Sequence, residues 1–183
     1  MAGNVKSTGS IVIAHAGVDW SKSQSKTAFK KESNWVVRRS DDSSRRYSTV
    51  VSNLLCNDRF SDDLKVEDVR EVLESGFKKQ TFERLKLLLD VNSAELAKVI
   101  RVPTRTIARR VGFKADESER ILRVAKVFHR SIEVMEDLEQ ARQWFKTPKK
   151  ALGEKTPFEF CNTDIGANAV INLLGRIEHG VFT

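Results

Sequence analysis

The stretch that decides the fold is SAELAKVIRVPTRTIARRV, residues 93–111, and its pattern predicts two short helices joined by a tight turn. We expect Ser93 to be the N-cap of the first helix, because its hydroxyl can accept an unpaired backbone N–H of the opening turn. Pro103 suits the first turn of the second helix, where a missing N–H costs nothing. The buried residues that would lock such a helix-turn-helix are Ala97, Val102 and Ile107.

The second helix of this motif is expected to present a basic face. Between Leu96 and Lys114 the chain carries six basic residues and no acidic one. Such a surface suits the phosphates and groove edges of DNA. The candidate DNA-binding residues are Arg101, Thr104, Arg105, Thr106, Arg109 and Arg110.

A structural interpretation of the same stretch stays open. Two amphipathic helices with a turn occur in many all-helical proteins, and a basic face is often only solvated. Arg101 also stands in the turn where glycine is usual, because glycine adopts the left-handed conformation without penalty. DNA contact and simple helix pairing are therefore alternatives at this point.

Length and charge allow one domain, or one domain with an appendage, and a real hydrophobic core. The 183 residues carry a formal net charge of +7, which is unevenly placed. Residues 1–115 hold 22 basic and 14 acidic side chains, against 10 and 11 in residues 116–183. The basic half favours a polyanionic partner, and the nearly neutral half suits a partner of another kind.

Cysteine usage and hydropathy predict a cytoplasmic location. Cys56 and Cys161 belong to no C-x-x-C pattern, so free thiols in a reducing compartment are expected. The apolar run at 11–17 is too short and too polar for the core of a signal peptide. No run approaches the length of a membrane span, and we expect no membrane partner.

The chain divides into three parts on composition and periodicity. Residues 1–62 predict an extended N-terminal arm, irregular or partly disordered, to which we assign no chemistry. Residues 63–115 form the predicted helix-turn-helix domain, which opens with two further helices, the first ended by Gly76. Residues 116–183 form a second, small helical domain. The predicted fold class is all-α.

A long helix is expected to open the second domain, with a capping arrangement at 116–119. Its predicted core stripe is Ile121, Val124, Ala125, Phe128, Ile132 and Met135. Its predicted polar face is Arg120, Arg123, Lys126, Arg130 and Glu133. Shorter helices follow at 138–145, after a capping box at 156–159, and after a cap at 162–164, the last one ended by Gly180.

Nothing in the sequence predicts catalysis, a metal or a cofactor. The histidines His15, His129 and His179 are scattered, without ligand spacing to a cysteine or to each other. We interpret His129 as structural or solvent-facing. No phosphate loop or serine-centred elbow is present. The acidic cluster Glu133, Glu136, Asp137 and Glu139 is interpreted as a solvated patch.

Residues from about 65 to 183 resemble the antitoxins of the Xre/MbcA/ParS group, which accompany RES-domain toxins. The resemblance rests on ordered motifs whose combination is specific. They are RTI and RR at 105–107 and 109–110, ESER at 117–120 with Arg123, WF at 144–145 before Pro148, LG at 152–153, TP at 156–157, and Thr163, Gly166 and Val170 before LGRIEHG at 174–180.

This resemblance implies an Xre-like helix-turn-helix domain followed by a toxin-binding domain. RES toxins resemble ADP-ribosyltransferases and destroy cellular NAD, and inhibition in the group looks like occlusion of the toxin's NAD pocket by the C-terminal end of the antitoxin. The toxin-binding residues implied here are Trp144, Arg176, His179, Gly180, Val181 and Phe182. The alternative is that Phe182 packs on its own core and Gly180 is only a C-cap.

We therefore predict a type II antitoxin that neutralises a RES-type toxin and represses its own operon. Operator DNA and the cognate toxin are the expected partners, and a homodimer is expected because one short recognition helix rarely gives enough affinity. The alternative is a stand-alone transcription regulator whose C-terminal helices only dimerise it. A protein-localisation adaptor is the third interpretation, and an enzyme is the last.

Overall fold

The computed structural model describes residues 66–181 as a set of packed helices, which confirms the predicted all-α class. The arm predicted for residues 1–62, His15, Cys56 and Phe182 lie outside the described residues. The helices are α3 (Val66–Ser75), α4 (Lys79–Leu89), α5 (Ser93–Val99), α6 (Thr104–Arg109), α7 (Ala115–Met135), α8 (Leu138–Lys146), the 3₁₀ turn η1 (Lys150–Leu152), α9 (Pro157–Phe160) and α10 (Asp164–Glu178).

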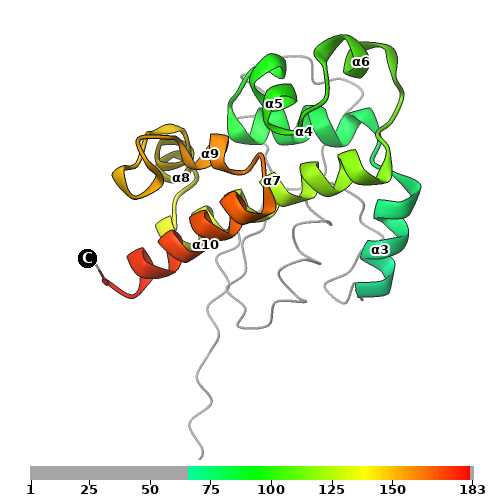
Figure 1. Cartoon of the computed structure of the whole chain (residues 1–183). Helices are drawn as coiled ribbons and strands as arrows, with labels where there is room; N and C mark the ends of the chain where they lie inside the picture. The colour runs from blue at the N-terminus through cyan, green and yellow to red at the C-terminus, as the bar shows by residue number, and fades with distance from the viewer. Residues whose placement is uncertain (1–65, 182–183) are drawn as a thin grey trace, which may run out of the picture.

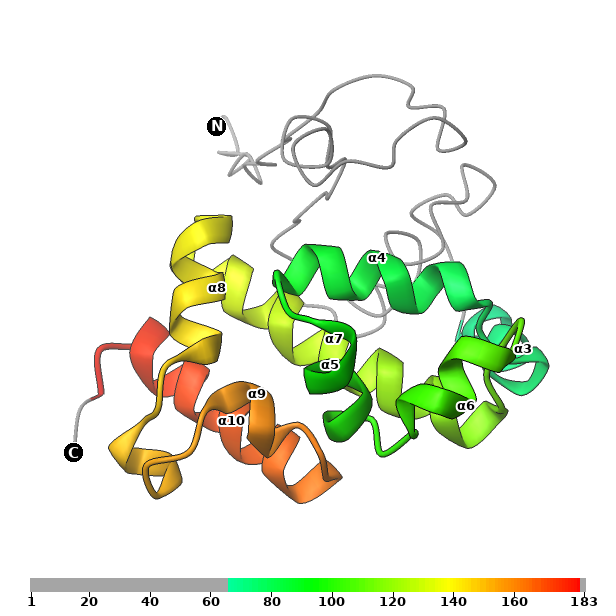
Figure 2. The same cartoon turned by 90° about the horizontal axis from the view of Figure 1, so that it is seen from above.

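Helix α7 is the central element. In the view from above it passes between α4 and α10, with α3 and α6 near its start and α8 at its end (Figure 2). The predicted apolar stripe is confirmed: Met135 is half-buried and the other five residues are buried. The predicted polar face is wrong at Glu133, which is only 2% exposed, because α7 is a central helix that other elements contact on several sides. Leu122 and Val127 are buried as well.

The start of each helix in the helix-turn-helix differs by one residue from the expectation. Asn92, not Ser93, is the N-cap of α5: its side chain accepts the Glu95 N–H at 2.9 Å, and the Glu95 carboxylate accepts the Asn92 N–H at 2.8 Å. Asn92 is favoured over Ser93 as the N-cap because this reciprocal capping box satisfies two backbone donors. Pro103 is the N-cap of α6 and not a residue of its first turn.

The turn between α5 and α6 has the expected form. Ala97, Val102 and Ile107 are buried, as predicted for the residues that lock the pair. Arg101 has a φ of +55°, the left-handed conformation that the sequence assigned to this position. A non-glycine residue is strained there by about 1–2 kcal/mol, so the packing around the turn must hold it.

Two loops are joined beside this motif. The Phe113 N–H donates to the Phe77 carbonyl at 2.8 Å, and the Lys79 N–H donates to the Val111 carbonyl at 2.9 Å. Gly76, which ends α3 as predicted, has a φ of +80°, and a Cβ there would lie 2.1 Å from the Phe113 carbonyl oxygen. The loop after α3 therefore fixes the loop that leads from α6 into α7.

The C-terminal helices are attached to the rest by arginines. Arg123 donates to both carboxylate oxygens of Asp164 at 2.6 and 2.8 Å, and Arg130 pairs with Glu178, so both ends of α10 are held on α7 (Figure 1). The buried Arg142 of α8 donates to the Leu88 carbonyl at 2.7 Å, at the end of α4. None of the described helices combines the length and apolar character needed to cross a bilayer.

Two of the remaining caps are as predicted, and the cap of α7 is shifted. Thr156 and Glu159 form the predicted capping box at α9, with Glu159 N–H to Thr156 Oγ1 at 3.1 Å. Thr163 caps α10 through the Gly166 N–H at 3.1 Å. At the start of α7 the Glu117 carboxylate accepts the Lys114 N–H at 2.8 Å, so the cap lies two residues before the predicted 116–119.

Candidate functional site

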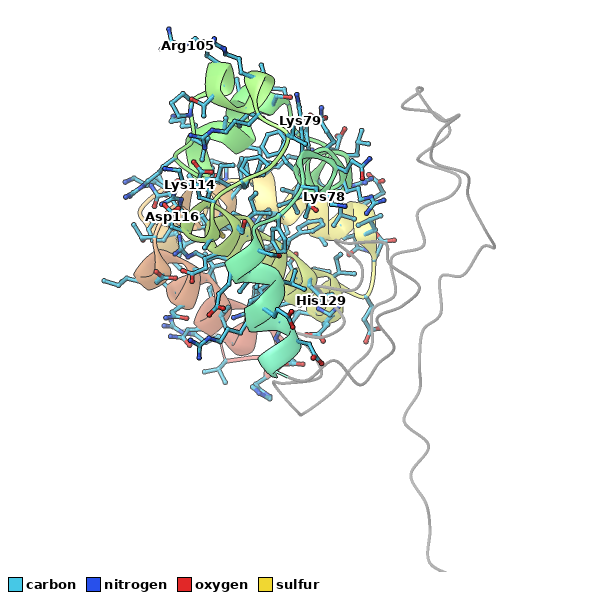
Figure 3. The ribbon with its side chains drawn as sticks, turned by 90° about the vertical axis from the view of Figure 1, so that its right-hand side faces the viewer. Lys78, Lys79, Arg105, Lys114, Asp116 and His129 are labelled. Carbon is cyan, nitrogen blue, oxygen red and sulfur yellow. The ribbon has the colours of Figure 1, made fainter. Side chains whose placement is uncertain are left out.

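The outer surface of α6 carries exposed cations. Arg105 and Arg109 are exposed on the helix, and Arg101 is exposed in the turn before it. Figure 3 shows Arg105 at the tip of the molecule, away from Lys78, Lys79 and Lys114. Thr104, the first residue of α6, is exposed as well, so four of the six predicted DNA-binding residues are accessible on α6 and the turn before it.

Two of the predicted DNA-binding residues have a different setting. Thr106 is half-buried. Arg110 is half-buried and pairs with Glu117, which is 8% exposed. Arg110 Nη1 donates to the two carboxylate oxygens of Glu117 at 2.9 and 3.0 Å. The Arg110 side chain is therefore engaged within the protein.

Sequence reasoning missed a polar contact at the start of α7. The Ser118 hydroxyl accepts the Phe77 N–H and donates to the Lys114 carbonyl, both at 2.8 Å. Ser118 is buried between two glutamates in the first turns of α7. A small hydroxyl residue between charged residues at a helix start signals a local hydrogen bond, but its partner in another loop depends on the tertiary fold.

The end of α10 forms a complete Schellman C-cap. The Val181 N–H donates to the Arg176 carbonyl at 2.9 Å, the Gly180 N–H donates to the Ile177 carbonyl at 3.2 Å, and Gly180 has a φ of +65°. Arg176 and His179 are exposed, and Val181 is 53% exposed. The predicted toxin-binding residues in this part thus face solvent.

Trp144 is half-buried on α8, with the Lys149 ammonium 5.3 Å from its ring centroid. Helix α8 and the end of α10 lie at the same end of the molecule (Figures 1 and 2). No hydrogen bond or ring contact among the described residues joins Trp144 to the chain end. The structure therefore places these predicted residues at one end without linking them directly.

The predicted acidic patch is not one solvated surface. Glu136, Asp137 and Glu139 are exposed, but Glu133 is buried, accepts Arg130 at 3.1 Å and lies 3.8 Å from Nδ1 of the buried His129. His129 is buried, so the interpretation of this histidine as a structural residue is confirmed, and the interpretation of it as solvent-facing is wrong (Figure 3). Residues 66–181 hold no group of His, Cys, Asp and Glu suited to a metal ion.

A groove of about 520 Å³ lies between α5 and the start of α10, and the sequence did not indicate it. Lys98 and Lys155 line it, together with the ring of Phe160. Ile165, also in its lining, is 85% exposed. The groove lies at the opposite end of α10 from Val181.

Comparison with known proteins gives two adjoining family matches. Residues 68–126 match the Antitoxin Xre-like helix-turn-helix domain, and residues 131–180 match the Antitoxin Xre/MbcA/ParS C-terminal toxin-binding domain. The chain is 33% identical over 116 residues to an Antitoxin Xre of Yersinia enterocolitica, covering 61% of this chain and 78% of the relative. It is 31% identical over 115 residues to an Antitoxin Xre of Photorhabdus laumondii, covering 60% and 78%.

Proposed function

Since this chain belongs to the Xre family of antitoxins, with a helix-turn-helix domain and a toxin-binding C-terminal domain, we propose that it neutralises a RES-type toxin by inserting its C-terminal end into the toxin's active site. Family membership makes its own role non-enzymatic.

The exposed end of α10 is the observation that carries this proposal. The Val181 N–H takes part in the Schellman cap of α10, yet the residue is 53% exposed to solvent. An apolar side chain held outside the core, next to a glycine that permits close backbone approach, suits insertion into a partner's pocket. Arg176 and His179 are exposed close to it in sequence, and the guanidinium of Arg176 can pair with an acidic side chain of the toxin.

Co-expression with the toxin encoded beside this chain tests the proposal. The toxin alone should stop growth and deplete cellular NAD, and this chain should reverse both effects. Removal of residues 180–183 should abolish the rescue while DNA binding persists. Full rescue by the shortened chain would refute occlusion by the C-terminal end.

A matched pair of substitutions separates this surface from general loss of apolar contact. Val181→Asp should lower toxin affinity by at least about tenfold, because a charge would enter a desolvated pocket. Ile165→Asp changes an apolar residue at the other end of α10 that is even more exposed than Val181, and it should leave toxin binding unchanged. Equal losses in both variants, measured by calorimetry, would contradict the assignment.

We further propose that α6 binds operator DNA and that the chain represses its own operon as a homodimer. The exposed Arg101, Arg105 and Arg109 support this function. A dimer places two recognition helices on paired half-sites, which supplies the affinity that one six-residue helix lacks. Because operator DNA lies in the cytoplasm, this proposed role implies a cytoplasmic location.

Fluorescence anisotropy with the DNA upstream of the chain's own reading frame tests this second role. Arg109→Met should weaken binding and reduce the slope of log K against log salt by about 0.9, the value for one lost phosphate contact. Lys150→Met, an exposed cation on η1, serves as the control and should leave the slope unchanged. Equal slopes in both variants would count against α6 as the DNA-binding element. A chain that binds DNA but never rescues growth would instead favour a stand-alone regulator.

A further inference from the structure

We propose that Arg110 and Glu117 form a positioning pair that sets the orientation of the recognition helix α6, and that Arg110 does not contact DNA. The inference rests on the proposed DNA binding by α6. It divides the basic residues of the motif into two groups. Arg105 and Arg109 meet the nucleic acid, and Arg110 holds the helix that carries them.

The pair joins the end of α6 to the start of α7. Arg110 is the C-cap of α6, with extended backbone angles, and Glu117 is the third residue of α7. Arg110 Nη1 donates to both carboxylate oxygens, at 2.9 and 3.0 Å, and Glu117 Oε2 also accepts the Lys114 N–H at 2.8 Å. One carboxylate therefore fixes both the cap of α7 and the C-cap residue of α6.

Burial makes this pair costly to open. Glu117 is 8% exposed, so its carboxylate depends on its partners rather than on water. If Arg110 turned toward a phosphate, it would leave that carboxylate without its cation, and an uncompensated buried charge is strongly destabilising. The exposed Arg105 and Arg109 form no ion pair with any residue of the described part, so they can meet phosphates without such a loss.

A second contact supports the same helix from α4. The Lys79 ammonium donates to the Ala108 carbonyl at 3.1 Å, near the end of α6, and the Lys79 N–H donates to the Val111 carbonyl. Helix α6 has only six residues, and helices that short depend on tertiary contacts for their stability. Its direction is therefore set by α4 on one side and by Glu117 on the other.

The direction in which one substitution changes DNA affinity distinguishes a positioning role of Arg110 from DNA contact. Glu117→Gln keeps the shape and removes a negative charge; Glu119→Gln removes the same charge from an exposed position two residues away. If the pair positions α6, Glu117→Gln should lower affinity for the upstream DNA by about tenfold relative to Glu119→Gln, about 1.4 kcal/mol. If Arg110 is a phosphate contact, freeing it should leave affinity equal or higher, and the proposal fails.

A double variant tests the same point independently. In the Glu117→Gln background, Arg110→Met should change neither affinity nor the salt slope further, because the pair is already broken. A further fall in the slope of about 0.9, one phosphate contact, would show that Arg110 touches DNA. The Met side chain keeps most of the arginine stem, so packing of the stem is preserved.

Amide hydrogen exchange gives a readout without DNA. Residues 104–109 should exchange faster in Glu117→Gln than in Glu119→Gln, while residues 121–132 of α7 stay equally protected in both. Equal exchange of α6 in the two variants would overturn the positioning role. If the wild-type chain binds no upstream DNA, the proposed DNA function fails, and exchange still decides whether the pair orders α6.

Discussion

Replacement of two glycines in α10 should have opposite effects on stability. A Cβ on Gly166 would lie 2.0 Å from the Phe160 carbonyl oxygen, whereas a Cβ on Gly175 meets nothing within 4 Å. Both positions are helical, so alanine gains about 1 kcal/mol of helix propensity at each. The difference between the two variants is therefore due to packing alone.

The magnitude follows from the contact distance. Real Cβ atoms do not approach backbone oxygen closer than 3.0 Å, so Gly166→Ala must displace α9 or α10 by about 1 Å. Overpacking of this kind costs about 1–3 kcal/mol, and the rigid backbone on both sides favours the upper end, for a net loss of about 2 kcal/mol after the propensity gain. Gly175→Ala should gain about 1 kcal/mol.

Thermal unfolding followed by circular dichroism measures both variants. For a chain of this length the melting temperature changes by about 2–4 °C per kcal/mol. Gly166→Ala should therefore melt roughly 4–8 °C below the wild type, and Gly175→Ala roughly 2–4 °C above it. Stabilisation by both substitutions would show that α10 does not approach Phe160 as closely as the structure has it, and the reasoning would be wrong.

Three further predictions concern buried or capped groups. Arg142→Met should destabilise the chain by about 2 kcal/mol in urea unfolding, because it leaves the buried carbonyl of Leu88 without its charged donor; a neutral effect would contradict this contact. Hydrogen bonds from the N-cap residue Thr156 lower the pKa of Glu159. The ionised Glu159 carboxylate should therefore stabilise the fold above about pH 4.5, and this stabilisation should vanish as the pH falls through the lowered pKa. Glu159→Gln should remove this part of the acid dependence of the melting temperature, and an unchanged pH profile would refute the prediction. Burial raises the pKa of the Cys161 thiol, so in a Cys56→Ser background Ellman's reagent at pH 8 should react only after denaturant is added, and rapid labelling of the native protein would show that the thiol is accessible.

Local patterns predicted much of the described fold. The spacing of Ala97, Val102 and Ile107 identified the locked pair of helices, and the left-handed turn at Arg101 followed from its place between them. The capping box at Thr156 was readable because all of its hydrogen bonds lie within four residues. Such features depend on neighbours in sequence, which a single chain displays directly.

Features that depend on tertiary packing were not readable in the same way. Periodicity assigned Glu133 to a polar face, but its carboxylate is buried and is accompanied by Arg130. Arg110 looked like its neighbour Arg109 in the sequence, and only the position of Glu117 on the next helix gives Arg110 a partner within the protein. A charged side chain has no local signal that tells a partner in the fold from a partner in solution.

The N-cap of α5 shows why neighbouring polar residues are hard to rank. Asn92 and Ser93 are both good N-caps in isolation. The choice depends on register, because Glu95 lies three residues after Asn92 and can return a hydrogen bond to its N–H. Starting the helix one residue later would place Glu95 where it cannot reach that donor. The reciprocal bond therefore decides the boundary.

Helix α7 makes the two matched domains one structural unit. The helix-turn-helix match ends at residue 126 and the toxin-binding match begins at 131, so both depend on this one continuous helix. Glu117 in its first turn holds α6, and Arg130, more than three turns later, holds the end of α10. The C-terminal helices also return to α4 through Arg142. Because the supports of both surfaces are built on the same helix, the orientation of α6 and that of the C-terminal end are fixed relative to one another.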